Sequence, residues 1–535
     1  MGTAPWIRIR QELYQQLQKH VQLLLGHEPA DLSRYREDFE REFQKAWRPS
    51  TRDVLFQEIG TSDIILLADF HALAQSQRSQ LRILKGLPKG LSLALAVEFF
   101  EARHQPLIDR YMAGDVTEKE FLKQIEWSRS WGFPFEHYRP LIRYAQKHRI
   151  PVYGLNRHFS ERTGRTLKLR DDFAAERILE IRREDPARKV LVVYGDLHLA
   201  SNHLPKSIEK QRGRKEILRV LSVFQNSEKI YFRLLEKEQE LSVDVVRLSR
   251  DQFCIISIAP WVKWQNYLLF LEKHLDKELA GESVEYTDHV SRFVKVIATD
   301  FNLRISEGSF SVYTPDDDSF WPKLAERYSG KELKTFRDLI LESKSFYVPE
   351  LQVGFLARPS VNHAAQLAMS VIHAEISGWR AFPQATPEDF LKMIWLEAVQ
   401  YFGSKLINPK RKTDTIQDLR AALASRSPLD MGEEALKIAL HQRMKEVLFL
   451  TGQNSKLTPA RPRRTASYRE AARLLGGMLG EKLYTGFRKK LMSGDAVLRL
   501  FRRSVDGPGF TEFYFELLEI VEGLPEAFLS KSEKM

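Results

Sequence analysis

The chain has 535 residues, a length that predicts two to four domains. Its hydrophobic content of 43% and charged content of 29% are ordinary for soluble globular proteins. The single cysteine, Cys254, excludes an intramolecular disulfide framework and a cysteine-rich metal site. The net charge of +11 is spread over several clusters, and no nucleic-acid-binding motif accompanies it, so nucleic acid is not the expected partner.

The first 26 residues are amphipathic and lack the continuous apolar segment of a signal peptide. The chain has no N-terminal cysteine that could carry a lipid, and no run approaches the roughly 20 apolar residues of a membrane span. We therefore expect a cytoplasmic protein with a helical extension over residues 1–50 and no transmembrane segment.

Residues 51–260 are predicted to form an α/β domain. Continuous apolar runs of strand length occur at 63–67, 91–97, 151–155 and 189–194, and helical patterns separate them. This alternation predicts a mainly parallel sheet flanked by helices, with the strands buried on both faces. Four further short runs are rich in β-forming residues and predict antiparallel strands that extend the sheet; they are 216–224, 229–235, 242–248 and 252–258.

Nearly all of the chain after residue 260 has a helical pattern. We expect a helical domain over 261–450, a basic linker at 451–464 and a C-terminal helical segment over 465–535. The predicted fold class is therefore α/β with an added all-α region. The helical half carries no motif of known chemistry, and a binding or homo-oligomerisation module is the expectation for it.

Polar residues follow three of the predicted strands. One strand ends in Asp69 and His71, another in Asp196 and His198, and a third in Glu98. The ligand crevice of an open parallel sheet lies beyond the carboxyl ends of its strands, so these side chains are expected to share a pocket. In the simpler alternative, each aspartate caps the helix that follows and each histidine fills a loop.

Two imidazoles and a carboxylate allow several chemistries. His71, Glu98 and His198 could form the open three-ligand set of a zinc site, or bind non-haem iron. A histidine could instead act as the general base of a hydrolase. A histidine can also ligate the iron of haem. Trp127 and Trp131 favour packing, with an aromatic wall for a ligand as the alternative.

The order and spacing of these motifs resemble the ChaN-like haem-binding uptake family of the Tiki superfamily, over about residues 60–205. TraB-like and erythromycin esterase-like proteins are its more distant relatives. The resemblance rests on these segments: Ala68-Asp69-Phe70-His71, Glu98-Phe99-Phe100, Trp127, Trp131, Tyr138, Asn156, Arg170-Asp171 and Gly195-Asp196-Leu197-His198. The family opens its first motif with Gly-Glu, where this chain has Ala68-Asp69, and many members are lipoproteins.

The resemblance implies haem or iron handling, and hydrolysis for the more distant relatives. The leading hypothesis is a pocket that binds haem or a divalent metal (iron or zinc) through His71, Glu98 and His198. The residues expected around the ligand are Asp69, Trp127, Trp131, Tyr138, Asn156 and Asp196. The alternatives are a hydrolase of peptide or ester bonds that uses the same three residues as its catalytic groups, and a degenerate scaffold.

Overall fold

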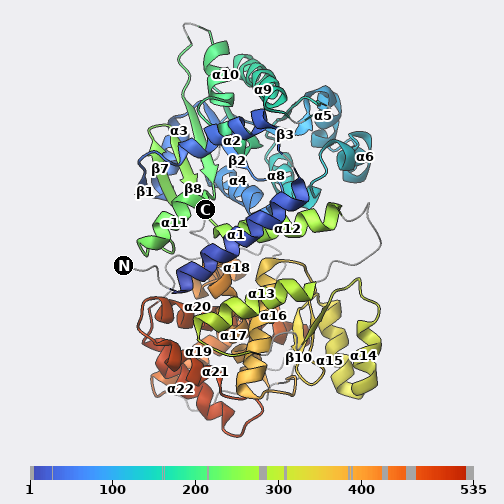
Figure 1. Cartoon of the computed structure of the whole chain (residues 1–535), viewed down its shortest axis with the longest axis vertical. Helices are drawn as coiled ribbons and strands as arrows, with labels where there is room; N and C mark the ends of the chain where they lie inside the picture. The colour runs from blue at the N-terminus through green and yellow to red at the C-terminus, as the bar shows by residue number, and fades with distance from the viewer. Residues whose placement is uncertain are drawn as a thin grey trace. The chain divides into compact units, whose positions relative to one another are not determined.

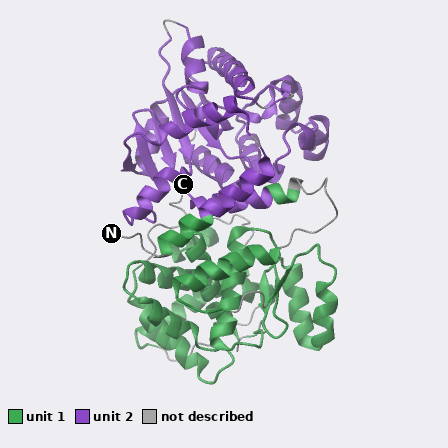
Figure 2. Ribbon diagram, viewed as in Figure 1, with its two compact units in different colours: residues 1–13, 271–534 green, residues 14–270, 535 purple. Residues whose placement is uncertain are grey.

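The structure is a computed structural model of the chain. It describes residues 5–26, 28–88, 90–159, 161, 163–213, 216–275, 286–305, 310–383, 386, 389–424, 432–453 and 465–525. The chain divides into two compact units, shown in different colours in Figure 2. We call residues 14–270 the α/β unit, and residues 1–13 with 271–534 the helical unit. Among the described residues, no helix is both long enough and apolar enough to cross a membrane.

The α/β unit contains an eight-stranded sheet with the order β1-β7-β8-β6-β2-β5-β3-β4 (Figure 1). Five of its seven strand pairs are parallel, and only the pairs that involve β7 are antiparallel. The predicted mainly parallel sheet is thus confirmed. The strands are β1 (Arg48–Ser50), β2 (Ile64–Asp69), β3 (Leu93–Glu101), β4 (Val152–Asn156), β5 (Lys189–Gly195), β6 (Val220–Gln225), β7 (Val245–Ser249) and β8 (Gln252–Ile255).

Helices bury the central strands of this sheet, which explains their continuous apolar runs. All six residues of β2 are buried, and so are six of the seven residues of β5. On one face, the side chains of β2, β3 and β5 share a core with α3, α4, α5 and α8, and α9 contacts β4 and β5. The helices are α2 (Ala30–Glu42), α3 (Arg52–Thr61), α4 (Ala74–Gly86), α5 (Gln105–Ala113), α6 (Glu118–Gln124), α7 (Trp127–Ser130), α8 (Phe135–Lys147), α9 (Gly164–Glu184), α10 (Leu204–Gln211) and α11 (Glu228–Glu236), with the 3-10 turns η1 (Ala102–His104) and η2 (Asp196–Leu199).

The ladder between β3 and β5 stops before the strands end. Its last backbone pair is Val97 with Val193, and the register between β3 and β4 also shifts after Val97. The carboxyl ends of these strands therefore part just where Glu98 leaves the ladder. This separation gives side chains room at the edge of the sheet where ligands bind in open α/β folds.

Two predictions for the runs after residue 216 were wrong. The run 216–224 was expected to form an antiparallel strand, but β6 pairs in parallel with both β2 and β8, and β8 is antiparallel only to β7. Residues 229–235 form the helix α11 instead of a strand. Their buried positions, Ile230, Tyr231, Leu234 and Leu235, follow helical spacing, and Ser227 caps the first turn. The β-branched and aromatic content of this run suggested a strand, but its apolar period is that of a helix.

The helical region after the α/β unit is confirmed, with one addition. A small sheet with the order β10-β11-β9 lies within it, and its three-residue strands are too short to give a periodic signal. Its strands are β9 (Ser311–Tyr313), β10 (Phe346–Val348) and β11 (Val353–Phe355). The helices are α13 (Tyr286–Asp300), α14 (Phe320–Arg327), α15 (Gly330–Leu341), α16 (Val361–Ser377), α17 (Phe390–Ile407), α18 (Ile416–Ala424), α19 (Glu433–Leu450), α20 (Thr465–Arg488), α21 (Gly494–Phe501) and α22 (Phe510–Glu522), while α1 (Pro5–Leu25) and α12 (Pro260–Leu275) contribute to both units. Most of the predicted linker, 454–464, lies outside the described residues.

Candidate functional site

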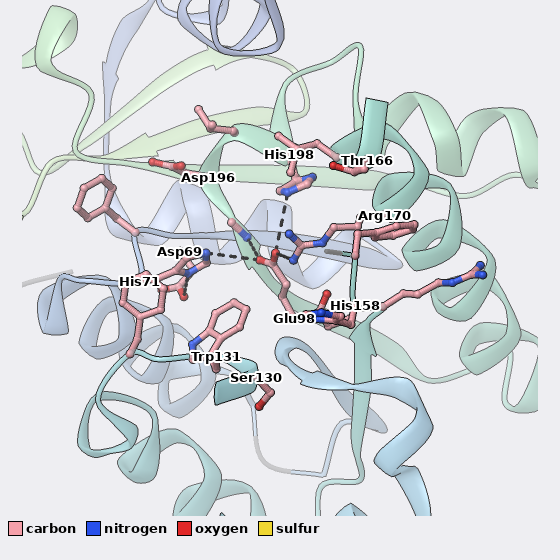
Figure 3. A pocket seen from close by; sticks show the side chains of 18 of the residues that line it. Asp69, His71, Glu98, Ser130, Trp131, His158, Thr166, Arg170, Asp196 and His198 are labelled. Carbon is pink, nitrogen blue, oxygen red and sulfur yellow. Dashed lines mark hydrogen bonds and ion pairs between the residues drawn. The ribbon is translucent and has the colours of Figure 1, made fainter. Parts of the chain in front are cut away.

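A cavity of about 340 Å³ lies at the carboxyl ends of β2, β3, β4 and β5 (Figure 3). Its floor is polar and one of its walls is aromatic. Seven residues of the floor are charged or polar and stand at or near strand ends or on α9; they are Asp69, His71, Glu98, Asn156, Arg170, Asp196 and His198. The strand ends thus bring the three principal candidate residues to one cavity.

His71 is held by the acid that precedes it. Its Nδ1 lies 2.8 Å from Oδ2 of Asp69, which also accepts a hydrogen bond from the hydroxyl of Tyr138 at 3.1 Å. The other oxygen of Asp69 accepts from the amides of Gln77 and Gln80 in α4, at 2.5 and 3.1 Å. With so many donors on Asp69, its carboxylate is fixed, and Nδ1 of His71 cannot turn towards the cavity.

The charge of His71 depends on opposing effects. Burial disfavours the imidazolium, but the adjacent carboxylates, Asp69 first among them, raise the pKa of His71 above its ordinary value of 6.5. Its side chain remains 23% exposed, and Nε2 points towards Glu98. His71 is therefore a basic imidazole with one accessible nitrogen.

Glu98 lies between the two imidazoles (Figure 3). Its oxygens are 3.9 Å from Nε2 of His71 and 3.9 Å from Nε2 of His198. The same carboxylate forms an ion pair with Arg170 of α9 and accepts the backbone N–H of Gly195 at 2.5 Å. Burial favours the neutral acid, but Arg170 and the imidazoles outweigh it and lower the pKa of Glu98 below 4.5.

His198 is also backed by a carboxylate. Its Nδ1 lies 2.6 Å from Oδ1 of Asp171, and the hydroxyl of Tyr35 is 2.8 Å from the same nitrogen. In contrast to His71, this side chain is only 5% exposed. Burial raises the pKa of Asp171 to about 8, so this acid is mainly protonated at neutral pH.

Trp131 and Phe133 form the aromatic wall beside His71. Their rings lie 4.6 and 5.1 Å from the imidazole, and both line the cavity. Trp127 and Tyr138, which were expected to contact a ligand, lie in the core behind this wall instead. Trp127 donates to the carbonyl of Phe133, so both residues support the wall without lining the cavity.

Asn156 and Asp196 do line the cavity. Asn156 ends β4, is 9% exposed, and its side-chain oxygen has no hydrogen-bond partner among the described residues. Asp196 opens the η2 turn, and burial raises the pKa of its carboxyl group. Both residues thus lie where they were expected, and their role as ligand contacts stays a prediction.

The three predicted ligands do not form a ready metal site. Among the described residues, no group of three or more histidine, cysteine, aspartate or glutamate side chains is arranged to hold a metal ion. Arg170 already pairs with Glu98, which makes this carboxylate part of an ion pair. The Nε2 atoms of His71 and His198 are among the metal donors that remain at the cavity, which His158, Glu161 and Asp196 also line.

Sequence reasoning assigned no role to three residues of this site: Tyr35, Arg170 and Asp171. The dipeptide Arg170-Asp171 gave a signal as part of a motif, and α9 aims its two side chains at Glu98 and His198. Tyr35 gave none, because it lies 163 residues from the histidine that it contacts.

Residues 55–163 match the family described as haem-binding uptake, Tiki superfamily, ChaN, which confirms the resemblance predicted from the motifs. A structure entitled "Cofacial heme binding to ChaN of Campylobacter jejuni" is similar at 14% identity, covering 34% of this chain and 88% of that one, with a TM-score of 0.26. "The structure of the type III effector HopBA1" is similar at 14% identity, covering 39% and 96%, with a TM-score of 0.28. No curated protein matched the chain.

Proposed function

Because residues 55–163 match a haem-binding uptake family, we propose that the α/β unit binds haem in this cavity, with Nε2 of His71 as the iron ligand. One observation carries the proposal. The His71 ring is fixed through Nδ1 by Asp69, and its Nε2, 3.9 Å from Glu98, is at a cavity with an aromatic wall. Haem in this role is cargo for uptake or transfer.

The residues present fit such a ligand in three respects. An imidazole whose Nδ1 donates to a carboxylate presents a basic Nε2 in a fixed direction, as metal-ligating histidines do. The rings of Trp131 and Phe133 offer a flat apolar surface beside it. Arg157 at the exposed rim offers a cation for the carboxylates of haem. The volume of about 340 Å³ is at the small end of ligand pockets, so haem would be only partly enclosed.

Haem titration followed by the Soret absorption band tests this proposal. The wild-type chain should bind haem with a defined stoichiometry. His71→Ala should abolish the coordinated spectrum, and Asp69→Asn should weaken binding by about 10–100-fold, as loss of the group behind a metal ligand does. His148→Ala, which alters an exposed histidine at the end of α8 away from the cavity lining, is the matched control. Equal binding by His71→Ala and the control would refute the assignment.

Hydrolysis of peptide or ester bonds is the second candidate, favoured by two imidazoles on either side of Glu98, each of which contacts an aspartic side chain through Nδ1. His71 would accept a proton from water at Nε2, and Arg170 would stabilise the negative charge that develops on the substrate. The nearby Asp69 would stabilise the imidazolium formed at His71.

A panel of chromogenic esters and peptides tests the second candidate. Turnover should rise with pH through the pKa of His71, since the base must be neutral, and His71→Gln should lower kcat/KM by about 10²–10⁴-fold. His148→Gln should leave the rate unchanged. Turnover that His71→Gln does not lower would exclude this role.

A further inference from the structure

Helix α2 presents a polar stripe to the site. Asp31, Tyr35, Asp38 and Glu42 are spaced by four, three and four residues, which places them on one face of the helix. Each contacts α9 or the chain between β5 and α10. This helix precedes the family-matched segment 55–163. It contacts α9, which is labelled near it in Figure 1, and it also contacts η2.

Three members of the stripe attach α2 to the two segments that carry Asp171 and His198. Asp31 accepts the backbone N–H of Arg165 in the first turn of α9, at 3.2 Å. Glu42 accepts the backbone N–H of Ser201, just after η2, at 2.9 Å. Asp38 lies 3.4 Å from Nε2 of His203. Hydrogen bonds therefore join the start of α2 to the first turn of α9 and the end of α2 to the chain just after η2.

Tyr35, the fourth member, reaches the site itself. Its hydroxyl donates to Oδ2 of Asp171 at 2.7 Å and lies 2.8 Å from Nδ1 of His198. Its ring is stacked on His203, with 3.5 Å between centroids and an angle of 10°. Tyr35 is 7% exposed, so the stack and the hydrogen bonds together hold its hydroxyl in one place.

The contact between Tyr35 and His198 determines which ring nitrogen of His198 faces the cavity. Nδ1 faces two oxygens, those of Tyr35 and Asp171, on the α2 side of the ring. Nε2 consequently faces Glu98. Rotation of the ring would break both contacts at Nδ1 and leave a buried nitrogen without a partner, at a cost of about 1–3 kcal/mol.

We propose that α2 supports the pocket from behind its lining and that Tyr35 is a positioning residue. Its hydroxyl contacts both Asp171 and Nδ1 of His198 and so fixes the ring of His198. The residues that position the lining of the cavity thus extend beyond the family-matched segment to α2, although α2 contributes none of the described residues that line the cavity itself. The inference deepens the proposed function, on which its relevance to haem or substrate rests, but the placement of the ring can be tested without any ligand.

Deuterium exchange at C2 of each imidazole, resolved by peptide mass spectrometry of the full chain, tests the proposal. Tyr35→Phe keeps the stacked ring and removes only the hydroxyl. Exchange at His198 should become about 2–10-fold faster, as expected for the loss of one hydrogen bond, while His71 stays unchanged. Tyr111→Phe is the control, because it removes a hydroxyl from another buried tyrosine of the same unit, which is stacked on Phe121 and does not line the cavity.

Unchanged exchange at His198 in Tyr35→Phe would overturn the proposal, and so would equal acceleration at His71, which would indicate general loosening. Haem titration of the same variant separates the two proposals. Weaker haem binding together with faster exchange at His198 supports both. A wild-type chain that binds no haem refutes the proposed function while the exchange result still decides the role of Tyr35.

Discussion

Asp171→Asn tests the electrostatics of the site through stability. The side chain of Asp171 is 1% exposed, and its pKa is raised from 3.8 to about 8 by burial. A raised pKa means that the folded state holds a proton that the unfolded chain has already lost. The stabilising contribution is complete below pH 3.8 and is lost as the pH rises to about 8. The slope is about 1.4 kcal/mol per pH unit and flattens near pH 8, where half of the folded molecules have already lost the proton, so the wild type should lose about 2 kcal/mol between pH 6 and pH 8 from this group alone.

The asparagine variant resembles the neutral acid in shape and cannot ionise. The difference in unfolding free energy between variant and wild type should therefore shift by about 2 kcal/mol in favour of the variant over the same pH interval. Titrating groups that lie away from Asp171 affect both proteins alike and cancel in this difference.

Cys254 provides an assay specific to the α/β unit. It is the only cysteine of the chain, lies in β8 and is fully buried. Short pulses of a thiol reagent at increasing urea concentrations will label it only where this unit has unfolded. A difference between the two proteins that stays constant within about 1 kcal/mol from pH 6 to pH 8 would refute the reasoning.

Three further outcomes are expected. Asp69→Asn should lower the pKa of His71, measured by the pH dependence of deuterium exchange at C2 of the imidazole. Because the pKa of His71 is raised in the folded state, the stability that this group contributes is present below pH 6.5 and is lost above the folded value. The variant should therefore be more destabilised at pH 6 than at pH 9. Tyr138→Phe should lower the free energy of unfolding of the α/β unit by about 1 kcal/mol, measured by Cys254 labelling, because it removes one hydrogen-bond donor to Asp69. An unchanged free energy of unfolding would contradict this contact. Gly476→Ala should destabilise the helical unit by about 1–3 kcal/mol in urea unfolding followed by circular dichroism, because a Cβ there would lie 2.6 Å from a carbonyl oxygen of α17. Gly523→Ala is the control and should change the stability little, because the added Cβ would make only an ordinary contact at 3.7 Å.

The sequence predicted the sheet well because its central strands are buried on both faces, which leaves an unbroken apolar run for each. It also predicted which strand ends carry polar groups, and the structure brings His71 and His198 within 3.9 Å of the same carboxylate. Whether these residues act as ligands or catalysts stays a prediction. The run at 229–235 was misassigned because composition was weighed above period.

The partners of the site could not be predicted in the same way. Tyr35 approaches His198 only because α2 packs on α9, and no local pattern encodes that packing. Trp127 and Trp131 carry the same side chain, but one lies in the core and the other lines the cavity, because α7 ends at Ser130 and Trp131 leaves the helix. Tertiary contacts of this kind depend on the whole fold.

The early end of the β3–β5 ladder has a consequence for any genetic test of this pocket. After Val97, the next link between the two strands is made by a side chain, since Glu98 accepts the N–H of Gly195. The carboxylate of Glu98 therefore has two roles. It holds the ends of β3 and β5 together, and it places a negative charge between the two imidazoles. Replacing it with alanine would release the strand ends and alter the shape of the cavity together with its chemistry. An inactive Glu98 variant would thus be ambiguous. Substitutions at His71, whose side chain takes no part in the Glu98–Gly195 link between β3 and β5, are the cleaner evidence for what the pocket does.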